Sequence, residues 1–296
     1  MGESVPYQLI AIDLDGTLLC PEGKVQPRVR QAVHRVLQAG YVVCFATGRN
    51  YMEARDVIET VGHFDHAVFV GGAVVVDTTK GVTVHQQKMQ PQLARELSAE
   101  LEALGHAVLA LQDADGAGFD YFVTDGVPLD DSTHRWMEAF KIRLQPLPSL
   151  AEHDHAHTIR VGIVGPVGKT TEARRRINER FAERVTVHAL RVLNNVEVLE
   201  CFDPSVNKWE GIKQVAAHHG IDLSRVVAIG DDFNDLAMIR RAGLGVAMGN
   251  ARPEIKAVAR RVIGANADDG LAIFLEELAE KGPASPSGQQ PGTNAA

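Results

Sequence analysis

A short apolar run near the N-terminus, Leu9–Ile12, ends at two aspartates one residue apart, Asp13 and Asp15. Such a run is typical of a buried strand, and the charges mark its end. Residues two apart in an extended strand point to the same side, so both carboxylates are expected to share a pocket, with Gly16 allowing a sharp turn after them. Two neighbouring carboxylates repel each other unless a cation lies between them, and oxygen ligands alone favour Mg2+. The alternative is an exposed turn, because Asp-Gly is a common turn signal.

Two further apolar runs also end in polar residues. The run at 226–230 leads directly into Asp231-Asp232-Phe233-Asn234-Asp235, and the run at 41–46 leads into Thr47-Gly48-Arg49. Ligands bind at the C-terminal ends of the strands in an open parallel sheet, so these residues are expected along one edge of one sheet. The Thr47 hydroxyl and the free amides of a helix that begins near Asn50 would suit a phosphate. By itself, Thr-Gly-Arg is more often an ordinary turn from a strand to a helix.

A single lysine, Lys208, opens a predicted amphipathic helix whose apolar face carries Ile212, Val215 and Ala216. A lysine near the start of a helix is usually solvated. The N-terminus of a helix carries a partial positive charge, which disfavours a lysine there. The position of Lys208 therefore indicates an anionic group nearby.

Together these motifs resemble those of one enzyme superfamily. The order Asp-x-Asp-Gly-Thr, Thr-Gly-Arg, Lys and Gly-Asp-Asp-x-Asn-Asp, spread over roughly residues 7–280, is similar to that of the haloacid dehalogenase-like hydrolases. More narrowly, the chain resembles the Cof-type phosphatases, which carry a large cap between the second and third motifs. The resemblance implies an α/β fold, with a Rossmann-like, doubly wound parallel sheet as the core and an inserted α+β cap domain.

The resemblance assigns a role to most motif residues. Asp13 would be the nucleophile that becomes an aspartyl phosphate, and Asp15 would protonate the leaving oxygen and then activate water. The residues assigned to the phosphoryl group are Thr47, Gly48, Lys208 and Asn234. Those assigned to Mg2+ are Asp13, Asp231 and, through its backbone carbonyl, Asp15. The supporting residues are Arg49, Gly72 and Asp235, of which Asp235 would make a second metal contact or orient Lys208. Asp232 receives no role.

The activity implied by the resemblance is the magnesium-dependent hydrolysis of a small phosphorylated metabolite, for example a sugar phosphate. Two alternatives stay open. One is a phosphotransferase or phosphomutase that uses the same intermediate, which the catalytic motifs do not separate from a hydrolase. The other is a non-catalytic protein that binds a phosphorylated metabolite. The intact acidic set argues against the second, because a binding protein does not need an acid two residues after a nucleophile.

The domain organisation follows from a change of pattern along the chain. Strands alternate with helices at first, which indicates right-handed βαβ units. We expect a discontinuous catalytic core at 1–84 and 203–282, an α+β cap with an antiparallel sheet at 85–202, and a disordered, Pro- and Gly-rich tail at 283–296. In the turn Gly71-Gly72-Ala73, Gly71 replaces an asparagine that is usual in the family.

Composition limits the partners. The net charge is −8 and no basic block occurs, so we expect no nucleic-acid binding. Three scattered cysteines indicate a reducing compartment, and the absence of a signal-peptide pattern or a membrane-spanning run indicates a cytoplasmic protein with no membrane partner, as a monomer or small homo-oligomer. His153, His155 and His157 alternate as metal ligands do, but three histidines in a loop are more often solvated.

Overall fold

The computed structural model describes residues 7–192 and 196–283 of the 296-residue chain. Within these ranges the chain forms two compact units. The first unit comprises residues 7–48, 54–68 and 211–283, and the second comprises 49–53 and 69–210. The core and cap boundaries expected from the sequence stay a prediction. The predicted tail at 283–296 lies outside the described residues, except for Pro283.

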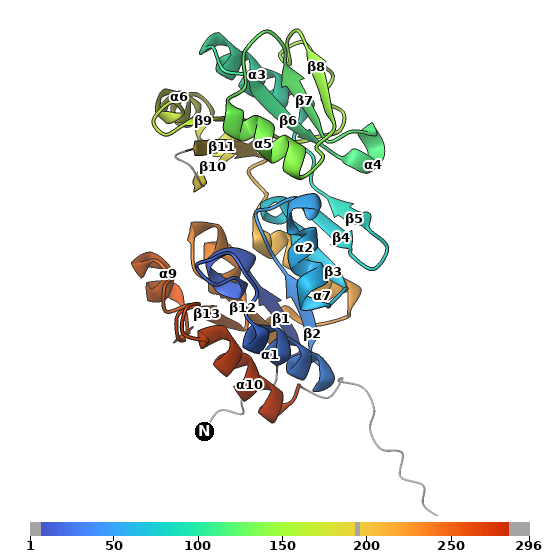
Figure 1. Cartoon of the computed structure of the whole chain (residues 1–296), viewed down its shortest axis with the longest axis vertical. Coiled ribbons are helices and arrows are strands. Elements are labelled where there is room, and N and C mark those ends of the chain that lie inside the picture. Colours follow the sequence, from blue (N-terminus) through green and yellow to red (C-terminus); the bar gives the residue numbers. More distant parts are fainter. Residues whose placement is uncertain (1–6, 193–195, 284–296) are drawn as a thin grey trace, which may run out of the picture. The chain divides into compact units, whose positions relative to one another are not determined.

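The first unit is built on a parallel sheet (Figure 1). β1 (Leu9–Ile12) lies between β2 (Val42–Phe45) on one side and β12 (Val226–Gly230) on the other. β13 (Leu244–Ala247) and β14 (Arg261–Val262) continue the sheet beyond β12, with every pair parallel. The chain therefore extends the sheet first to one side of β1 and later to the other. The gap between β1 and β12 is the point where the strand order reverses, which is where ligands bind in folds of this type.

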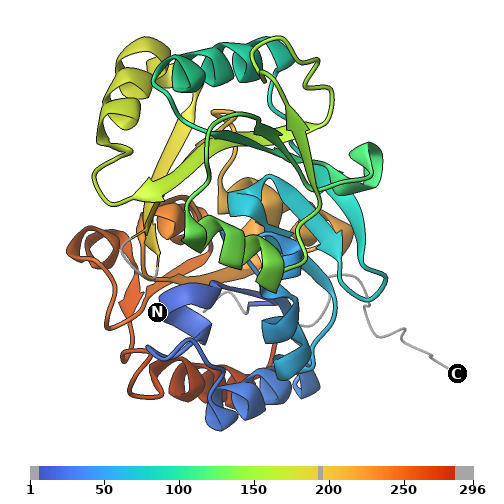
Figure 2. The same ribbon diagram turned by 45° about the horizontal axis from the view of Figure 1, so that its top comes forward.

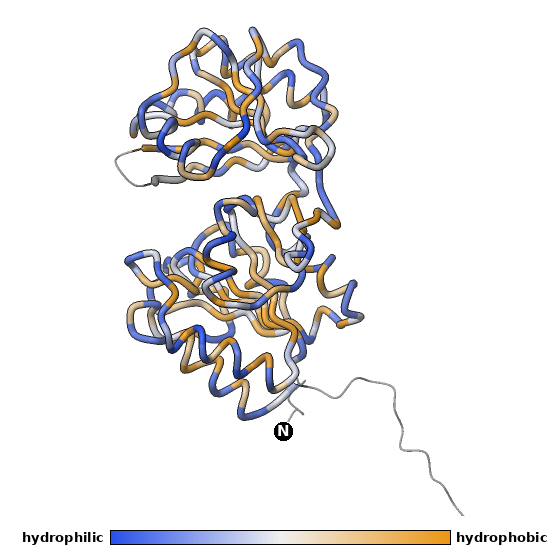
Figure 3. The backbone as a smooth tube through the Cα atoms, turned by 45° about the vertical axis from the view of Figure 1, so that its right-hand side comes forward, coloured by the Kyte–Doolittle hydropathy of each residue, from blue (hydrophilic) through white to orange (hydrophobic). Residues whose placement is uncertain are grey.

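The strands β1, β2 and β12 are apolar along their length, and the hydropathy colours show hydrophobic segments in the middle of this unit (Figure 3). Every residue of β1 and of β12 is buried. Parallel sheets are covered on both faces, and their strands therefore appear as continuous apolar runs rather than as alternating patterns. The three runs identified in the sequence are β1, β2 and β12.

Helices connect and cover these strands. α1 (Pro27–Gln38) begins with a proline in its first turn and buries one apolar face, and it packs along α10 (Gly270–Lys281). Arg28 joins the two helices through hydrogen bonds to Glu276 and Asp269. The remaining helices that contribute to this unit are α2 (Tyr51–Val61), α7 (Lys208–His218), α8 (Leu236–Arg241) and α9 (Pro253–Val258).

The second unit contains a six-stranded sheet in the order β10-β11-β9-β6-β7-β8. Its strands are β6 (Val108–Gln112), β7 (Tyr121–Thr124), β8 (Leu144–Leu147), β9 (Thr158–Pro166), β10 (Thr186–Val192) and β11 (Val196–Phe202). The expected antiparallel pairing is found in all neighbours except β7 and β8, which are parallel. The short helix between β7 and β8 supplies the crossover that a parallel pair needs.

Helices lie on both faces of this sheet (Figure 2). α3 (Pro91–Ala103) and α6 (Thr171–Phe181) share one apolar core with it, in which Leu97, Ile177 and Phe122 are buried together. α5 (Asp131–Ala139) covers the other face, where Trp136 contacts Tyr121 edge to face. The other elements of this unit are α4 (Ala114–Ala117) and the antiparallel hairpin of β4 (Val74–Asp77) and β5 (Val82–Gln86). β3 (His66–Phe69) belongs to the first unit, except for its last residue.

Among the described residues, no helix combines the length and the apolar character that crossing a membrane requires.

Candidate active site

Three carboxylates meet where the strand order of the first sheet reverses. One oxygen of each of Asp13, Asp231 and Asp235 lies within 4.8 Å of the others. Asp13 directly follows β1 and Asp231 directly follows β12, and these strands are parallel neighbours. Asp13 is 4% exposed and Asp235 is fully buried. Asp231 is half-buried, and the three carboxylates together offer an all-oxygen donor set of the kind that Mg2+ prefers.

Asp13 and Asp15 both lie beyond the end of the first strand. β1 ends at Ile12, Asp15 has the extended values φ −79° and ψ 119°, and the chain turns at Gly16, which has φ +81°. Asp15 is exposed, whereas Asp13 is buried. Strand pairing therefore does not fix the directions of the two side chains, and their sharing of one pocket stays a prediction.

Two glycines allow the acidic segments to approach. A β-carbon on Gly16 would lie 2.3 Å from Asp231 Oδ2, and one on Gly230 would lie 2.4 Å from Asp235 Cγ. Gly16 also has φ +81°, a conformation that other residues rarely adopt. Thr17 Oγ1 donates a hydrogen bond of 3.0 Å to Asp231 Oδ1. The turn after β1 therefore holds the carboxylate that follows β12.

Hydrogen bonds within the loop 231–235 fix its conformation. Asp235 Oδ2 accepts hydrogen bonds from the backbone N–H groups of Asp231 (2.8 Å) and Asp232 (3.0 Å). The Asp232 carboxylate caps the short 3-10 turn that contains Phe233, and Asp232 and Asp235 together form a capping box. Asp232 also forms an ion pair with Arg252, so it stabilises the loop and lies outside the carboxylate cluster. This explains the residue for which the sequence offered no role.

The residues expected at the phosphate begin at the end of β2. Thr47 is fully buried, and its N–H donates to the carbonyl of Val68 at 2.9 Å. A β-carbon on Gly48 would lie 3.8 Å from Asn234 Nδ2, so these two predicted phosphate residues are neighbours. The structure thus brings the end of β2 together with the second acidic loop.

Arg49 and the start of α2 belong to the second unit. The Arg49 guanidinium donates a 3.4 Å hydrogen bond to the carbonyl of Glu53. Asn50 Oδ1 accepts from the Glu53 N–H at 2.9 Å, and Glu53 Oε2 accepts from the Asn50 N–H at 2.8 Å. These reciprocal bonds form a capping box and fix where α2 begins.

Lys208 also lies in the second unit, as the first residue of α7. Its side chain is fully buried, unlike that of a usual lysine near the start of a helix. Gly72 has φ +109°, and a β-carbon there would lie 2.0 Å from the Asn207 carbonyl oxygen. Only glycine permits the 70–72 turn to lie against the backbone that leads into Lys208. Gly71, at φ +64°, keeps the left-handed conformation that asparagine tolerates.

A polar network inside the second unit was not found from the sequence. Arg160 and Glu200 form an ion pair with 10% and 8% of their side chains exposed. Arg160 also donates to the Tyr121 hydroxyl at 2.8 Å, and burial raises the pKa of Tyr121 to about 12. Trp136 Nε1 donates to Glu53 Oε1 at 2.7 Å. Charged residues inside the apolar strands β9 and β11 were the available signal.

Two contributors to the first acidic turn were also missed. Thr17 is part of the Asp-Gly-Thr motif but was given no role. Asn250 Nδ2 donates to the Gly16 carbonyl at 2.8 Å. Asn250 comes shortly after the end of β13, so a fourth apolar run followed by a polar residue was the signal.

Comparisons with known proteins give a matching family model and named relatives. The family model of the haloacid dehalogenase-like hydrolases matches residues 10–275. The HMP-PP phosphatase of Serratia proteamaculans (strain 568) is 27% identical over 278 residues, which cover 91% of this chain and 94% of that protein. The 5-amino-6-(5-phospho-D-ribitylamino)uracil phosphatase YitU of Bacillus subtilis (strain 168) is 28% identical over 281 residues, which cover 93% of this chain and 98% of that protein.

The fold is found in solved structures as well. A haloacid dehalogenase-like hydrolase from Bacteroides thetaiotaomicron matches with a TM-score of 0.74 at 22% identity, covering 92% of this chain and 99% of that one. The predicted fold class, an α/β core with a doubly wound parallel sheet and a cap, is confirmed. The family match extends over most of the sequence and includes the motifs after β1, β2 and β12. This chain belongs to the haloacid dehalogenase-like hydrolase family.

Proposed function

We propose that this chain is a magnesium-dependent phosphatase that hydrolyses a small phosphorylated metabolite through an aspartyl-phosphate intermediate. The enzyme class predicted from the sequence, a phosphoric monoester hydrolase, is supported by the family match and by relatives named as phosphatases. The observation that carries the proposal is the cluster of Asp13, Asp231 and Asp235 at the ends of two neighbouring parallel strands.

In the proposed reaction, Asp13 attacks the phosphorus atom and the bond from phosphorus to the leaving oxygen breaks. Asp15 gives its proton to that oxygen, so the product leaves as an alcohol. In the second step Asp15 takes a proton from a water molecule, whose oxygen attacks the aspartyl phosphate. Inorganic phosphate is released and the Asp13 carboxylate is restored. The buried position of Asp13 and the exposed position of Asp15 suit a nucleophile and a group that exchanges protons with solvent.

Asp13, Asp231 and the backbone carbonyl of Asp15 would hold the magnesium ion. When bound, the ion reduces the repulsion between the Asp13 carboxylate and the anionic phosphoryl group and aligns them. Asp235 Oδ2 accepts hydrogen bonds from the backbone N–H groups of Asp231 and Asp232, so we assign Asp235 first to positioning these residues.

Thr47, Gly48, Asn234 and Lys208 are the proposed phosphate ligands. Thr47 and Asn234 offer donors at or beside the edge where the carboxylates meet, and Gly48 leaves room next to Asn234. The assignment of Lys208 depends on the motif resemblance. Arg49 and Gly72 are proposed to support this set, Gly72 by its close fit against the Asn207 carbonyl.

The names of two relatives bear on the size and chemical class of the substrate. One is named for HMP-PP and the other for a phosphorylated ribitylaminouracil. We therefore propose a small phosphorylated metabolite for this chain as well, with a sugar phosphate as one example. A phosphotransferase or phosphomutase remains the second candidate, because the same Asp13 intermediate can pass its phosphoryl group to a hydroxyl.

The test is a phosphate-release screen over many phosphorylated metabolites, with Mg2+ and with a chelator, using wild type, Asp13→Asn and Asp56→Asn. Asp56 is exposed on α2 and serves as a matched control for the chemical change. We expect Asp13→Asn to lose activity by several orders of magnitude, because the nucleophile is gone, and Asp56→Asn to keep it. We expect chelation to silence the wild type, and added Mg2+ to restore it.

Circular dichroism shows whether Asp13→Asn remains folded, which separates a lost nucleophile from a lost fold. Undiminished turnover in folded Asp13→Asn would contradict the covalent mechanism. Hydrolysis that persists in the chelator would contradict the metal assignment. Formation of an isomer without release of phosphate would favour the mutase.

A further inference from the structure

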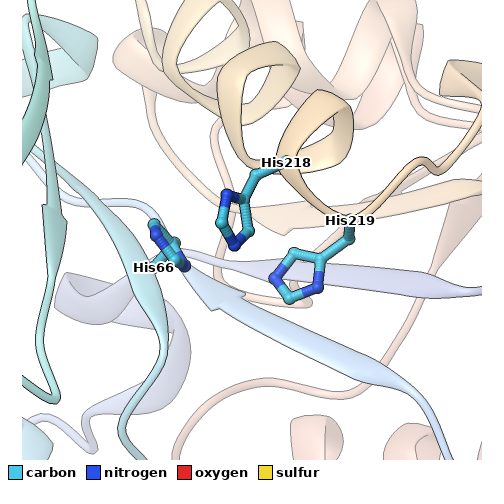
Figure 4. A group of neighbouring side chains, drawn as sticks. All are labelled: His66, His218 and His219. Atoms are coloured by element: carbon cyan, nitrogen blue, oxygen red, sulfur yellow. The ribbon is translucent and has the colours of Figure 1, made fainter.

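A second group of potential metal ligands lies in the first unit, away from the carboxylates. His66 begins β3, His218 ends α7 and His219 follows it (Figure 4). One ring nitrogen of each histidine lies within 4.8 Å of the others. The ring centroids of His66 and His218 are 3.9 Å apart, and those of His218 and His219 are 5.1 Å apart. No role in the proposed phosphatase reaction uses these residues.

Asp65 orients the ring of His66. His66 Nδ1 lies 3.0 Å from Asp65 Oδ1, within hydrogen-bond distance, which leaves His66 Nε2 as the nitrogen with a free lone pair. A carboxylate that accepts a hydrogen bond from one nitrogen of a histidine, while the other nitrogen binds metal, is a recurrent arrangement in metal sites. The His66 side chain is only 11% exposed, so its orientation is well fixed.

His219 supplies an independent observation. Its Nε2 is buried, and among the described residues it has no hydrogen bond of acceptable geometry. It lies 3.3 Å from Asp65 Oδ1. A bound cation would satisfy a nitrogen that is otherwise buried without a hydrogen bond.

We propose that His66, His218 and His219, with Asp65 beside them, form a binding site for a transition-metal ion of the zinc type. Imidazole nitrogens suit Zn2+, whereas Mg2+ prefers oxygen. Three histidines with a carboxylate or a water molecule complete the four positions that zinc takes in proteins.

The position of this histidine site points to a stabilising role. His66 is at the start of β3, which continues the parallel sheet from β2 through the bridge between Ala46 and Val68, whereas the carboxylates are at the ends of their strands. The two sites thus lie at opposite edges of the sheet. α7 already packs closely on β3, since a β-carbon on Gly211 would lie 2.4 Å from Val68 Cγ1. A bound ion would fasten the end of α7 to the start of β3.

The experiment is calorimetric titration of ZnCl2 into the full chain after removal of metals with a chelator. It compares wild type, Asp231→Asn, His218→Ala and His134→Ala. His218 and His134 are both exposed at helices, so the two alanine variants are matched and neither should disturb the core. Asp231→Asn disables the carboxylate cluster and removes any contribution of that site to zinc binding.

We expect one saturable zinc site in wild type, Asp231→Asn and His134→Ala, and at least about tenfold weaker binding in His218→Ala. Zinc should also raise the melting temperature of the first three proteins and leave that of His218→Ala nearly unchanged, because a ligand of the folded state stabilises it. Equal binding by His218→Ala and wild type would overturn the proposal, as would the absence of saturable binding. Loss of binding in Asp231→Asn alone would place the zinc at the carboxylates instead. None of these outcomes depends on phosphatase activity.

Discussion

Gly16 and Gly230 lie where a β-carbon would overlap a carboxylate of the acidic cluster. At the scale of single residues, the cluster therefore requires glycine at these two positions as well as the three carboxylates. Gly16 is the more constrained of the two, because its φ of +81° also excludes most other residues. The sequence indicated that glycine is needed here because the chain turns sharply. The close approach of Asp231 is a second reason why no side chain fits at this position.

Replacing this glycine tests the point. We expect Gly16→Ala to lower phosphatase activity by about 10²-fold, because the methyl group would displace the Asp231 carboxylate from the metal site. The left-handed backbone should also lower the free energy of unfolding by about 1–2 kcal/mol. Phosphate release and urea unfolding measure the two effects.

Gly126→Ala is the matched control. Gly126 has φ +79°, and nothing lies within 4 Å of a β-carbon built there. It should show a similar loss of stability with activity nearly unchanged. A Gly16→Ala enzyme with full activity would mean that the contact with Asp231 does not matter.

At the scale of elements, the sequence predicted the three strands before the site within a residue of their observed ends. The apolar runs at 9–12, 41–46 and 226–230 correspond to β1 (Leu9–Ile12), β2 (Val42–Phe45) and β12 (Val226–Gly230). The four-residue helix α4 and the polar strand β8 were missed. α4 is too short, and β8 too exposed, to show a periodic pattern of hydrophobic residues. Neither element can therefore be recognised from the sequence alone.

The loop before β9 differs from its expected state. Its three alternating histidines were expected to be solvated, but His155 is fully buried. His155 Nε2 lies 2.7 Å from the Leu150 carbonyl, and Nδ1 lies 2.9 Å from Thr158 Oγ1. A neutral ring that donates to Leu150 and accepts from Thr158 satisfies both contacts. Burial lowers the pKa of His155 below its usual value, although the bond to Leu150 opposes this.

This loop makes stability depend on pH. An unfolded histidine takes up a proton near pH 6.5. The folded His155 takes up a proton only at a lower pH. At pH values between the pKa of the folded state and that of the unfolded state, the unfolded state therefore binds more protons. The free energy of unfolding should therefore fall as the pH drops from 7 to 5. Urea titrations followed by tryptophan fluorescence measure it, because Trp136 and Trp209 both lie in the second unit.

The variants His155→Gln and His134→Gln identify the source of the effect. His155→Gln should reduce the pH dependence, and the exposed His134→Gln should leave it as in wild type. An unchanged slope in His155→Gln would show that other groups cause the dependence.

At the scale of the whole molecule, buried thiols report on the folding of both units. Cys20, Cys44 and Cys201 are all free and buried, and the last lies in the second unit. Burial raises the pKa of Cys201 to about 12 and holds that of Cys44 well above its usual range. Alkylation requires the thiolate, which is therefore nearly absent in the folded protein at pH 8.

We expect labelling of Cys44 and Cys201 by iodoacetamide at pH 8 to be more than about 10³-fold slower in the native protein than in guanidinium chloride. Mass spectrometry after digestion distinguishes the three sites, and the unfolded chain is the control. Rapid native labelling of Cys44 or Cys201 would mean that its unit opens far more often than its packing suggests.

The sequence by itself determined the strands, their order and the motif residues at their ends, because apolar runs and the charges that interrupt them are local properties of the chain. It therefore indicated the family, the doubly wound core and the pairing of the segments after β1 and β12. Only the tertiary structure decided which side chains meet. It placed Asp235 among the carboxylates and added Thr17 and Asn250, since these contacts join segments far apart in sequence. The histidine site has the same origin: His66 and His218 share no motif, and the packing of α7 on β3 alone brings them together.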